Sequence, residues 1–195
     1  MNALTPADLL SLEQYARERP AFRERVIAHK ARRHLAVGPN ATWCFEDRLT
    51  IQYQVQEMLR VERIFEAEGI ADELAAYNPL IPDGRNWKAT LLIEFVDPVE
   101  RARRLTELRG VEGRCWVQAQ GHERVFAIAD EDLERENDEK TSAVHFLRFE
   151  LTDAMIGALR DGAALRAGVD HPQYAHETGV TDETRRALIE DLKAG

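Results

Sequence analysis

The spacing of hydrophobic positions changes midway along the chain. Up to about residue 77, apolar residues recur at the three- and four-residue intervals of amphipathic helices. From about residue 87 onward, short runs alternate apolar and polar residues between turn-forming Gly, Pro and Asp, which is typical of strands. The pattern predicts a single α+β domain over residues 1–195. Its helical N-terminal half, about 5–77, packs on a mainly antiparallel sheet within about 87–195.

Start and stop signals divide the first part of the helical half. Thr5 and Ser11 are each followed by residues that open a helix. Pro20 should interrupt the first helix, because proline lacks the backbone N–H that a helix interior needs. We therefore expect a new helix from about Pro20 to Leu35, and a short extended piece over Ala41–Phe45.

The longest helix is predicted over Asp47–Glu68, a segment without Gly or Pro that is closed by Gly69. A shorter helix over Ala71–Tyr77 follows. On a helical wheel, an apolar stripe of the long helix comprises Ile51, Val55, Met58, Leu59 and Phe65. Glu62 falls inside this stripe and Glu57 lies on its flank. A carboxylate in an apolar stripe must be paired, protonated or ligated, because burying it bare is very costly.

The preceding helix supplies partners for these carboxylates, since His29 and Arg33 lie within or beside its own apolar stripe. Three interpretations of Glu62 follow. It forms a buried ion pair with Arg33 or His29 that fixes helix register, it lines a polar pocket for a small ligand or metal, or it reaches solvent at the helix edge.

The second half reads mainly as strands. They are predicted over Trp87–Val96, Arg114–Gln120, Glu123–Asp130, Ser142–Leu151 and Ala163–Val169. Helices are expected to begin at Pro98, Thr152 and Thr181, and Gly121-His122 reads as the turn of a hairpin. Asp130–Lys140 carries seven acidic and two basic residues, which indicates a solvated loop or short helix.

Two further positions could carry chemistry. His145 lies on the apolar face of its predicted strand, as either a hydrogen-bonded core residue or a ligand. His171 and Tyr174 follow the last strand, where functional side chains often gather, but Asp170-His171-Pro172 is also ordinary turn material.

Composition narrows the class of protein. Of 195 residues, 44% are hydrophobic and 31% charged, as in a globular protein with a core, and the net charge of −9 disfavours general nucleic-acid binding. No apolar run could cross a membrane, the N-terminus lacks a secretory pattern, and two distant cysteines exclude a disulfide framework, so a cytoplasmic location is expected.

One helix is nevertheless locally basic, either as a solvated face or as a docking patch for an acidic partner. The patch comprises Arg19, Arg23, Arg25, Lys30 and Arg32.

Familiar catalytic signatures are missing from the sequence. It contains no glycine-rich phosphate loop, G-x-S-x-G elbow, H-E-x-x-H or C-x-x-C motif. Two hypotheses therefore remain: an accessory or ligand-binding protein, and an enzyme or metalloprotein with a buried carboxylate and histidine site. Iron or manganese would suit the mixed ligands of the second.

Several segments together resemble an uncharacterised bacterial family catalogued as a domain of unknown function. They are FEDRLTIQYQVQEMLRVERIFEAEGIADELAAYNPLIP, TLLIEFVDP, SAVHFLRFEL and VDHPQY. The resemblance covers nearly the whole chain and carries no catalytic residues with it. It implies an association, because such genes often lie near those for rubrerythrin-like proteins and iron–sulfur oxidoreductases of the heterodisulfide-reductase type. The resemblance thus favours an accessory role in a redox or peroxide-stress setting, with a rubrerythrin-like or iron–sulfur partner.

Overall fold

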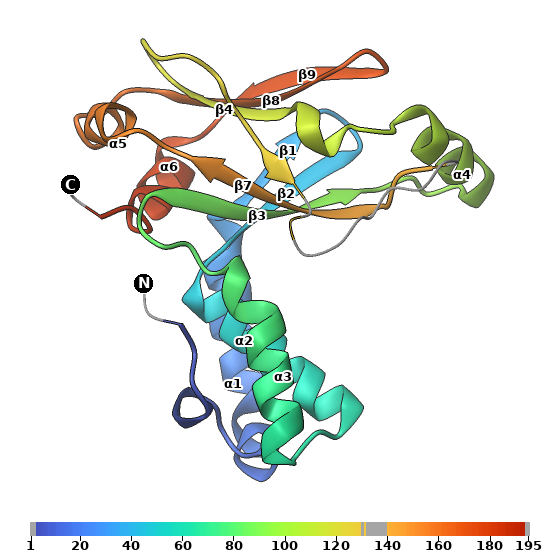
Figure 1. The fold of residues 1–195 in the computed structure, drawn as a ribbon, viewed down its shortest axis with the longest axis vertical. Helices are drawn as coiled ribbons and strands as arrows, with labels where there is room; N and C mark the ends of the chain where they lie inside the picture. The colour runs from blue at the N-terminus through green and yellow to red at the C-terminus, as the bar shows by residue number, and fades with distance from the viewer. Residues whose placement is uncertain (1–2, 130, 132–139, 194–195) are drawn as a thin grey trace.

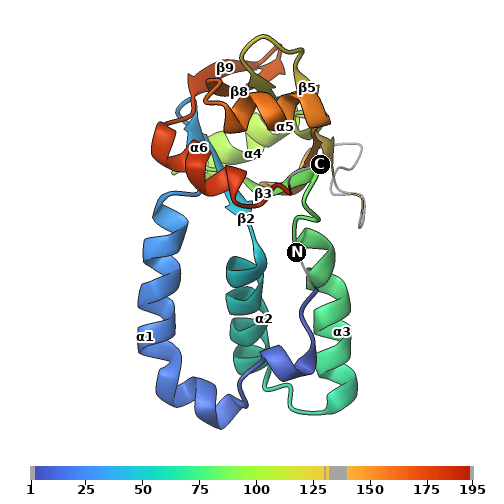
Figure 2. The same ribbon diagram turned by 90° about the vertical axis from the view of Figure 1, so that its left-hand side faces the viewer.

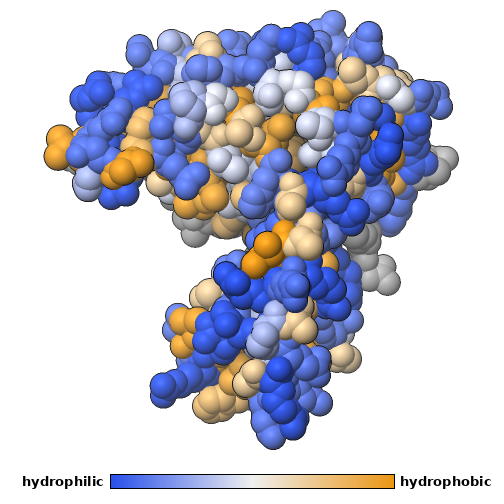
Figure 3. All heavy atoms as spheres, turned by 180° about the vertical axis from the view of Figure 1, so that it is seen from behind, coloured by the Kyte–Doolittle hydropathy of each residue, from blue (hydrophilic) through white to orange (hydrophobic). Residues whose placement is uncertain are grey.

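The computed structural model describes residues 3–129, 131 and 140–193. A helical arm projects from a body built of two sheets and three shorter helices (Figures 1 and 2). The arm also stands out from the wider body when all heavy atoms are drawn (Figure 3). This arrangement confirms the predicted α+β class with antiparallel sheets. Among the described residues, no helix is long and apolar enough to span a membrane.

Three α-helices lie side by side in the arm: α1 (Leu12–Ala31), α2 (Arg48–Glu62) and α3 (Ala67–Tyr77). Short 3-10 turns, η1 (Pro6–Asp8) and η2 (Asn78–Leu80), flank them. Ser11 caps α1 by accepting a hydrogen bond from the Gln14 N–H, as predicted. The helices pack on one another through Tyr15, Phe22, Val26, Ile51, Val55, Leu59 and Leu74.

The predicted break at Pro20 is wrong, because α1 runs through it without interruption. Pro20 is exposed, and so is Ala16, whose carbonyl loses its helical N–H partner. Water can satisfy that carbonyl, so the helix tolerates the proline. The helix ends at Ala31 rather than at Leu35, and the chain then enters a strand over His34–Val37 that was not predicted.

The predicted helix over Asp47–Glu68 is two helices. Its start is correct, since Asp47 caps α2 by accepting from the Thr50 N–H. The chain leaves α2 at Arg63, which adopts a left-handed φ of 55°. Gly69 is no cap but lies inside α3, where an added Cβ would come within 2.7 Å of the Ile64 side chain. Close packing of α3 on its entry loop therefore explains this glycine.

The body contains a five-stranded sheet in the order β1-β2-β3-β7-β6 and a four-stranded sheet in the order β5-β4-β8-β9. All pairs are antiparallel. The first sheet comprises β1 (His34–Val37), β2 (Ala41–Glu46), β3 (Asn86–Ile93), β6 (Ile128–Ala129) and β7 (Val144–Glu150). The second comprises β4 (Cys115–Ala119), β5 (Val125–Phe126), β8 (Leu165–His171) and β9 (Tyr174–Gly179).

One hydrophobic core joins the two sheets and the body helices α4 (Pro98–Glu107), α5 (Asp153–Arg160) and α6 (Asp182–Ile189). The short turn η3 (Glu112–Arg114) leads into β4. The alternate residues of β3 and β7 that face this core are fully buried, whereas the other face of the five-stranded sheet is only half-buried. That outer face looks toward the arm and carries Lys88, Phe146 and Arg148.

The strands of the second half largely match their predicted ranges, and Thr152 and Thr181 cap α5 and α6 as expected. The segment after Gly121 differs, because it switches sheets: β5 pairs with β4, whereas β6 pairs with β7. The strand β9 was not predicted. The acidic segment Asp130–Lys140 lies largely outside the described residues.

Candidate functional site

The residues singled out in the sequence do not form one site. His29 and Arg33 meet where the arm joins the body, and Glu57 lies along the arm. In the body, His145 lies in β7, whereas His171 and Tyr174 pair with each other across the β8–β9 turn. The geometry of each group decides what it can do.

Glu62 is exposed at the C-terminal end of α2, so the expectation that it points inward is wrong. The wheel assumed a helix that continues past Glu62, but α2 ends at this residue and Phe65 beyond it is 66% exposed. The stripe that faces the arm core is Ile51, Val55 and Leu59. Of the three interpretations, only the solvent-exposed edge agrees with the structure.

Glu57 is half-buried and belongs to an ion-pair network within the arm. Its carboxylate accepts hydrogen bonds from Arg19 Nε at 2.7 Å and Nη2 at 2.9 Å, from the Tyr15 hydroxyl at 2.6 Å and from Arg60 at 3.1 Å. The hydrogen bonds from Arg19 outweigh burial and hold the pKa of Glu57 at about 2. This carboxylate therefore ties α1 to α2 and has little capacity left for a ligand.

The junction of arm and body is built on Arg33, which is 1% exposed. Its guanidinium donates to the carbonyl oxygens of Phe45, Glu46 and Ala187 and to the Asp191 carboxylate. A second carboxylate, that of Asp47, lies 3.6 Å from Nη1. Arg33 thus connects the end of α1, the β2–α2 connection and the residues after α6.

His29 completes this junction cluster, because its Nε2 lies 2.5 Å from Asp47 Oδ2. Burial opposes the charge on Asp47, but Arg33, the Thr50 N–H and His29 outweigh it, so the pKa of Asp47 is lowered. Burial dominates at Asp191 instead and raises its pKa to about 6, against the attraction of Arg33. The predicted meeting of His29 and Arg33 with a carboxylate is real, but the carboxylates are Asp47 and Asp191.

Replacing Asp191 by Asn is expected to change how stability depends on pH. A carboxyl group whose pKa is raised in the folded state makes folding less favourable as pH rises from its unfolded value, about 3.9, to its folded value. The stability of the wild type relative to Asp191→Asn should therefore fall between about pH 4 and pH 6, by on the order of 2 kcal/mol. Urea unfolding of both proteins across this range measures it, and parallel curves would contradict the assignment.

His145 and His171 are each held by hydrogen bonds to neighbouring residues, and the Glu112 carboxylate lies 3.8 Å from His145 Nε2. Fully buried His145 places Nε2 2.9 Å from the Thr141 hydroxyl and 3.0 Å from the Ser142 carbonyl oxygen. The Gln173 N–H donates to His171 Nδ1, while His171 Nε2 lies 3.0 Å from the Arg109 carbonyl oxygen. These contacts fit structural roles for both rings.

Tyr174 is also a structural link, at the start of β9. Its hydroxyl donates to the Val37 carbonyl oxygen at 2.8 Å and accepts from the Asn40 N–H at 2.9 Å. It therefore fastens the second sheet to the β1–β2 turn. At that turn Gly38 has a φ of +74°, and a Cβ there would come within 2.7 Å of the Tyr174 hydroxyl oxygen.

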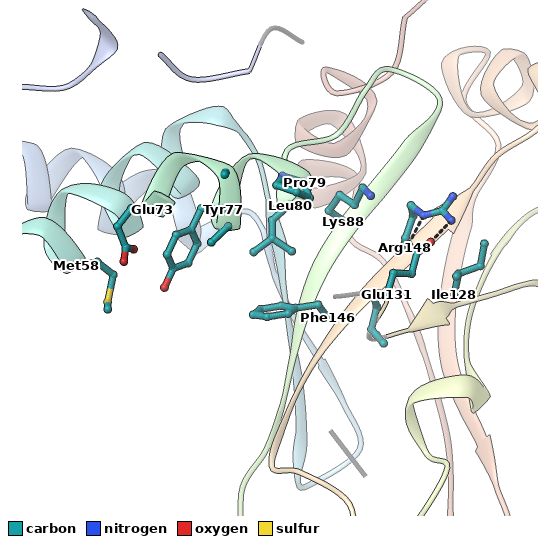
Figure 4. Close-up of a pocket in the computed structure, with 13 residues that line it drawn as sticks. Met58, Glu73, Tyr77, Pro79, Leu80, Lys88, Ile128, Glu131, Phe146 and Arg148 are labelled. Atoms are coloured by element: carbon teal, nitrogen blue, oxygen red, sulfur yellow. Dashed lines mark hydrogen bonds and ion pairs between the residues drawn. The ribbon is translucent and has the colours of Figure 1, made fainter. Parts of the chain in front are cut away.

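A cleft with a cavity volume of about 570 Å³ lies between the arm and the outer face of the five-stranded sheet. Figure 4 shows Glu73 and Tyr77 of α3 toward one end, Lys88, Glu131 and Arg148 toward the other, and Leu80 and Phe146 between them. Its further lining residues are Met58, Ala75, Ala76, Pro79, Ile128 and Leu147. The volume and the mixture of apolar walls with few polar groups are those of small-molecule sites.

Of the two basic side chains at the sheet end of the cleft, Arg148 is paired with carboxylates and Lys88 pairs with no described residue. Arg148 donates to both oxygens of Glu131, at 2.6 and 2.7 Å, and also to Glu150. Lys88 lies opposite Arg148 across the strand pair, yet makes no hydrogen bond or ion pair with any described residue. Burial, followed by repulsion from Arg148, lowers the pKa of Lys88. This ammonium group is therefore the available donor in the cleft.

The sequence contained a weak signal for this cleft. Lys88 is the one basic residue in the largely apolar run WKATLLIEFV, on the strand face opposite the core residues Ala89 and Leu91. Glu73 and Tyr77 gave no signal, because nothing in their spacing reveals which part of the sheet α3 approaches. The same is true of Asp191, which comes from the far end of the chain.

The basic patch predicted on α1 is partly engaged. Arg19 is paired with Glu57. Arg23 is exposed and Lys30 half-buried, and neither makes an ion pair with a described residue. The patch available to a partner therefore centres on the middle of α1.

The metal site considered from the sequence gains no support from the geometry. Within residues 3–129, 131 and 140–193, no group of three or more His, Cys, Asp or Glu side chains could hold a metal ion. Both cysteines are buried, and burial raises the pKa of the Cys44 thiol to about 11.

Comparison with known proteins places the chain among relatives of undetermined activity. A family model described as "Protein of unknown function (DUF3501)" matches residues 3–192. The fold is similar to the crystal structure of a novel protein of unknown function from Burkholderia pseudomallei, with a TM-score of 0.94 and 48% sequence identity. That match covers 98% of this chain and 100% of the other. No curated protein matches.

Proposed function

The chain belongs to this family of proteins of unknown function, and we propose that it works as an accessory protein that binds a small amphipathic organic acid. The observation that carries the proposal is the half-buried Lys88, which pairs with no described residue, in a cleft of about 570 Å³ whose middle is apolar. An ammonium group that is partly shielded from water and lacks an acceptor is stabilised when a ligand carboxylate supplies one.

The walls of the cleft support an apolar ligand body. Leu80, Phe146 and Met58 line the cavity, and the aromatic ring of Tyr77 lies beside them (Figure 4). Arg148 is already held by Glu131 and Glu150, so the ligand anion should contact Lys88 rather than Arg148.

We expect octanoate to bind, and Lys88→Met to weaken its binding by about tenfold or more, the usual cost of losing a charge-assisted hydrogen bond. Affinity should also fall as pH rises through the lowered pKa of Lys88, because the ammonium loses its charge. Isothermal titration calorimetry at several pH values measures both effects. Lys30→Met, which removes another half-buried lysine outside the cleft, is the matched control. Equal affinity of Lys88→Met and wild type would refute the assignment of the anchor.

We also propose that the accessory role includes docking to a rubrerythrin-like or iron–sulfur protein of a redox or peroxide-stress system. Three features of α1 support an acidic partner. Arg23 and Lys30 are unpaired among described residues, and the Arg25 guanidinium lies over the Phe22 ring, 4.6 Å from its centroid, without a carboxylate. The rest of a chain of net charge −9 repels an acidic partner, so a locally basic helix would orient that partner on this one surface.

The expected complex should be salt-sensitive, because exposed charges are screened within about 10 Å at 0.1 M salt. Exchanging both Arg23 and Arg25 for Glu should reduce capture of a purified rubrerythrin-like or iron–sulfur protein at low ionic strength. Arg17→Glu is the control, because Arg17 is an exposed α1 residue outside the patch. Unchanged capture by the double variant would rule out this surface.

A further inference from the structure

We infer that the cleft ligand has two polar ends: an anionic group held by Lys88 and an amine held by Glu73, with an apolar chain between them. This inference rests on the proposed function and specifies the chemical class of its ligand, an ω-amino carboxylate. It follows from the distribution of unsatisfied polar groups along the cleft.

The arm end of the cleft carries a carboxylate, that of Glu73, without a partner in the described part of the chain. Glu73 is half-buried and makes no hydrogen bond or ion pair with any described residue. Tyr77 lies one turn further along α3, so its side chain and that of Glu73 share one face of the helix. No described residue hydrogen-bonds the Tyr77 hydroxyl either, as distinct from the Tyr15 hydroxyl, which is bonded to Glu57. Together the two side chains offer a carboxylate and a hydroxyl oxygen to an ammonium group.

The middle of the cleft is apolar and has a definite length. Leu80 lies seven positions after Glu73, which corresponds to roughly 10 Å along a helix axis. Leu80 and Phe146 occupy the space between the two polar ends (Figure 4). Lys88 lies beyond Leu80, toward Arg148. The ligand must therefore cover an apolar distance of at least that order before it reaches the second polar group.

Opposite charges at the two ends discriminate between ligand classes. A simple fatty acid leaves Glu73 without a counter-ion, and a dicarboxylate places a second anion against it. A diamine pairs with Glu73 but repels Lys88. An ω-amino carboxylate satisfies both groups. The cleft is specific for it because the second carboxylate of a dicarboxylate is repelled by Glu73, and the second amine of a diamine is repelled by Lys88.

The test compares two ligand series by isothermal titration calorimetry on the full-length protein. One series is hexanoate, octanoate and dodecanoate, and the other consists of the ω-amino derivatives of the same acids. The inference predicts that the best ω-amino acid binds at least about tenfold more tightly than the acid of equal length, as expected for one added charge-assisted interaction. Glu73→Gln should remove that advantage by weakening the binding of the ω-amino acids, with no loss of affinity for the plain acids. Glu68→Gln, an exposed α3 carboxylate, is the control.

The outcomes separate the inference from the function on which it rests. If plain acids bind as tightly as their amino derivatives, or if Glu73→Gln affects neither series, the two-ended ligand is wrong but the acid-binding cleft stands. If no member of either series binds, both are wrong. Circular dichroism of each variant establishes that the substituted protein is folded, so that loss of binding reports on the cleft.

Discussion

Replacing Arg33 by Met is expected to lower the free energy of unfolding by about 3–5 kcal/mol, the cost of removing one partner of a buried ion pair. For a chain of this size, the loss corresponds to a decrease in Tm of roughly 6–20 °C. Arg33 is 1% exposed, and the variant leaves Asp47 and Asp191 buried without their cation. Three backbone carbonyl oxygens, those of Phe45, Glu46 and Ala187, lose their donor at the same time.

Urea and thermal unfolding of Arg33→Met measure this loss, and Arg32→Met is the neighbouring control. The Arg32 side chain is half-buried and has one weak contact, at 3.4 Å, with His29 Nδ1, so its loss should cost less than about 1 kcal/mol. The double variant Arg33→Met with Asp191→Asn should recover part of the stability. Similar losses for Arg32→Met and Arg33→Met would contradict the central role of the junction cluster.

Because Arg33 connects arm and body, we also expect the wild type to unfold in one transition, as a single domain.

The second large effect is expected from Gly168→Val in β8. Trp116 lies across this glycine, so an added Cβ would come within 2.4 Å of the indole ring and 2.8 Å of the His176 carbonyl oxygen. The ring is 1% exposed and covered by the Arg124 guanidinium at 3.9 Å, which restricts its movement. Overpacking of this kind typically costs about 1–3 kcal/mol, and the short contacts place this variant at or above the upper end.

Gly179→Val in β9 is the matched control, because no atom lies within 4 Å of the position of its added Cβ. Its effect on the free energy of unfolding should stay within about 0.5 kcal/mol. Tryptophan fluorescence during urea unfolding reports on the ring that Gly168→Val displaces. A loss below about 1 kcal/mol for Gly168→Val would show that Trp116 can move aside.

Local signals in the sequence predicted the fold class and most of the strands, because alternation and capping act over a few residues. Asp47 and Thr152 cap helices at the predicted positions. Pro20 shows where local reasoning failed: exposure of the preceding turn, which tertiary structure decides, allowed α1 to continue. The split between β5 and β6 was not predicted for the same reason: β5 completes the expected hairpin with β4, but the pairing of β6 with β7 in the other sheet is decided by tertiary structure.

The candidate site was predictable only in part. The position of His29 and Arg33 beside the apolar stripe of the predicted helix indicated that they need carboxylates, and the structure supplies these. The choice of Glu62 rested on a continuous helical wheel, and the left-handed Arg63 ended that helix. The actual partner Asp191 is more than 150 positions from Arg33, and no periodicity connects them. Long-range approach likewise brings Glu73 to the same cleft as Lys88.

The short connections at the junction have a mechanical consequence. Only Arg32 and Arg33 separate α1 from β1, and only Asp47 separates β2 from α2. Both connections are clamped together, because Arg33 and Asp47 face each other and share the cluster with His29. We therefore expect the arm and the body to keep a fixed relative orientation rather than to move about a hinge. On this expectation, the proposed ligand would enter a cleft that already has its bound width, and its affinity would not be reduced by the cost of closing the protein around it.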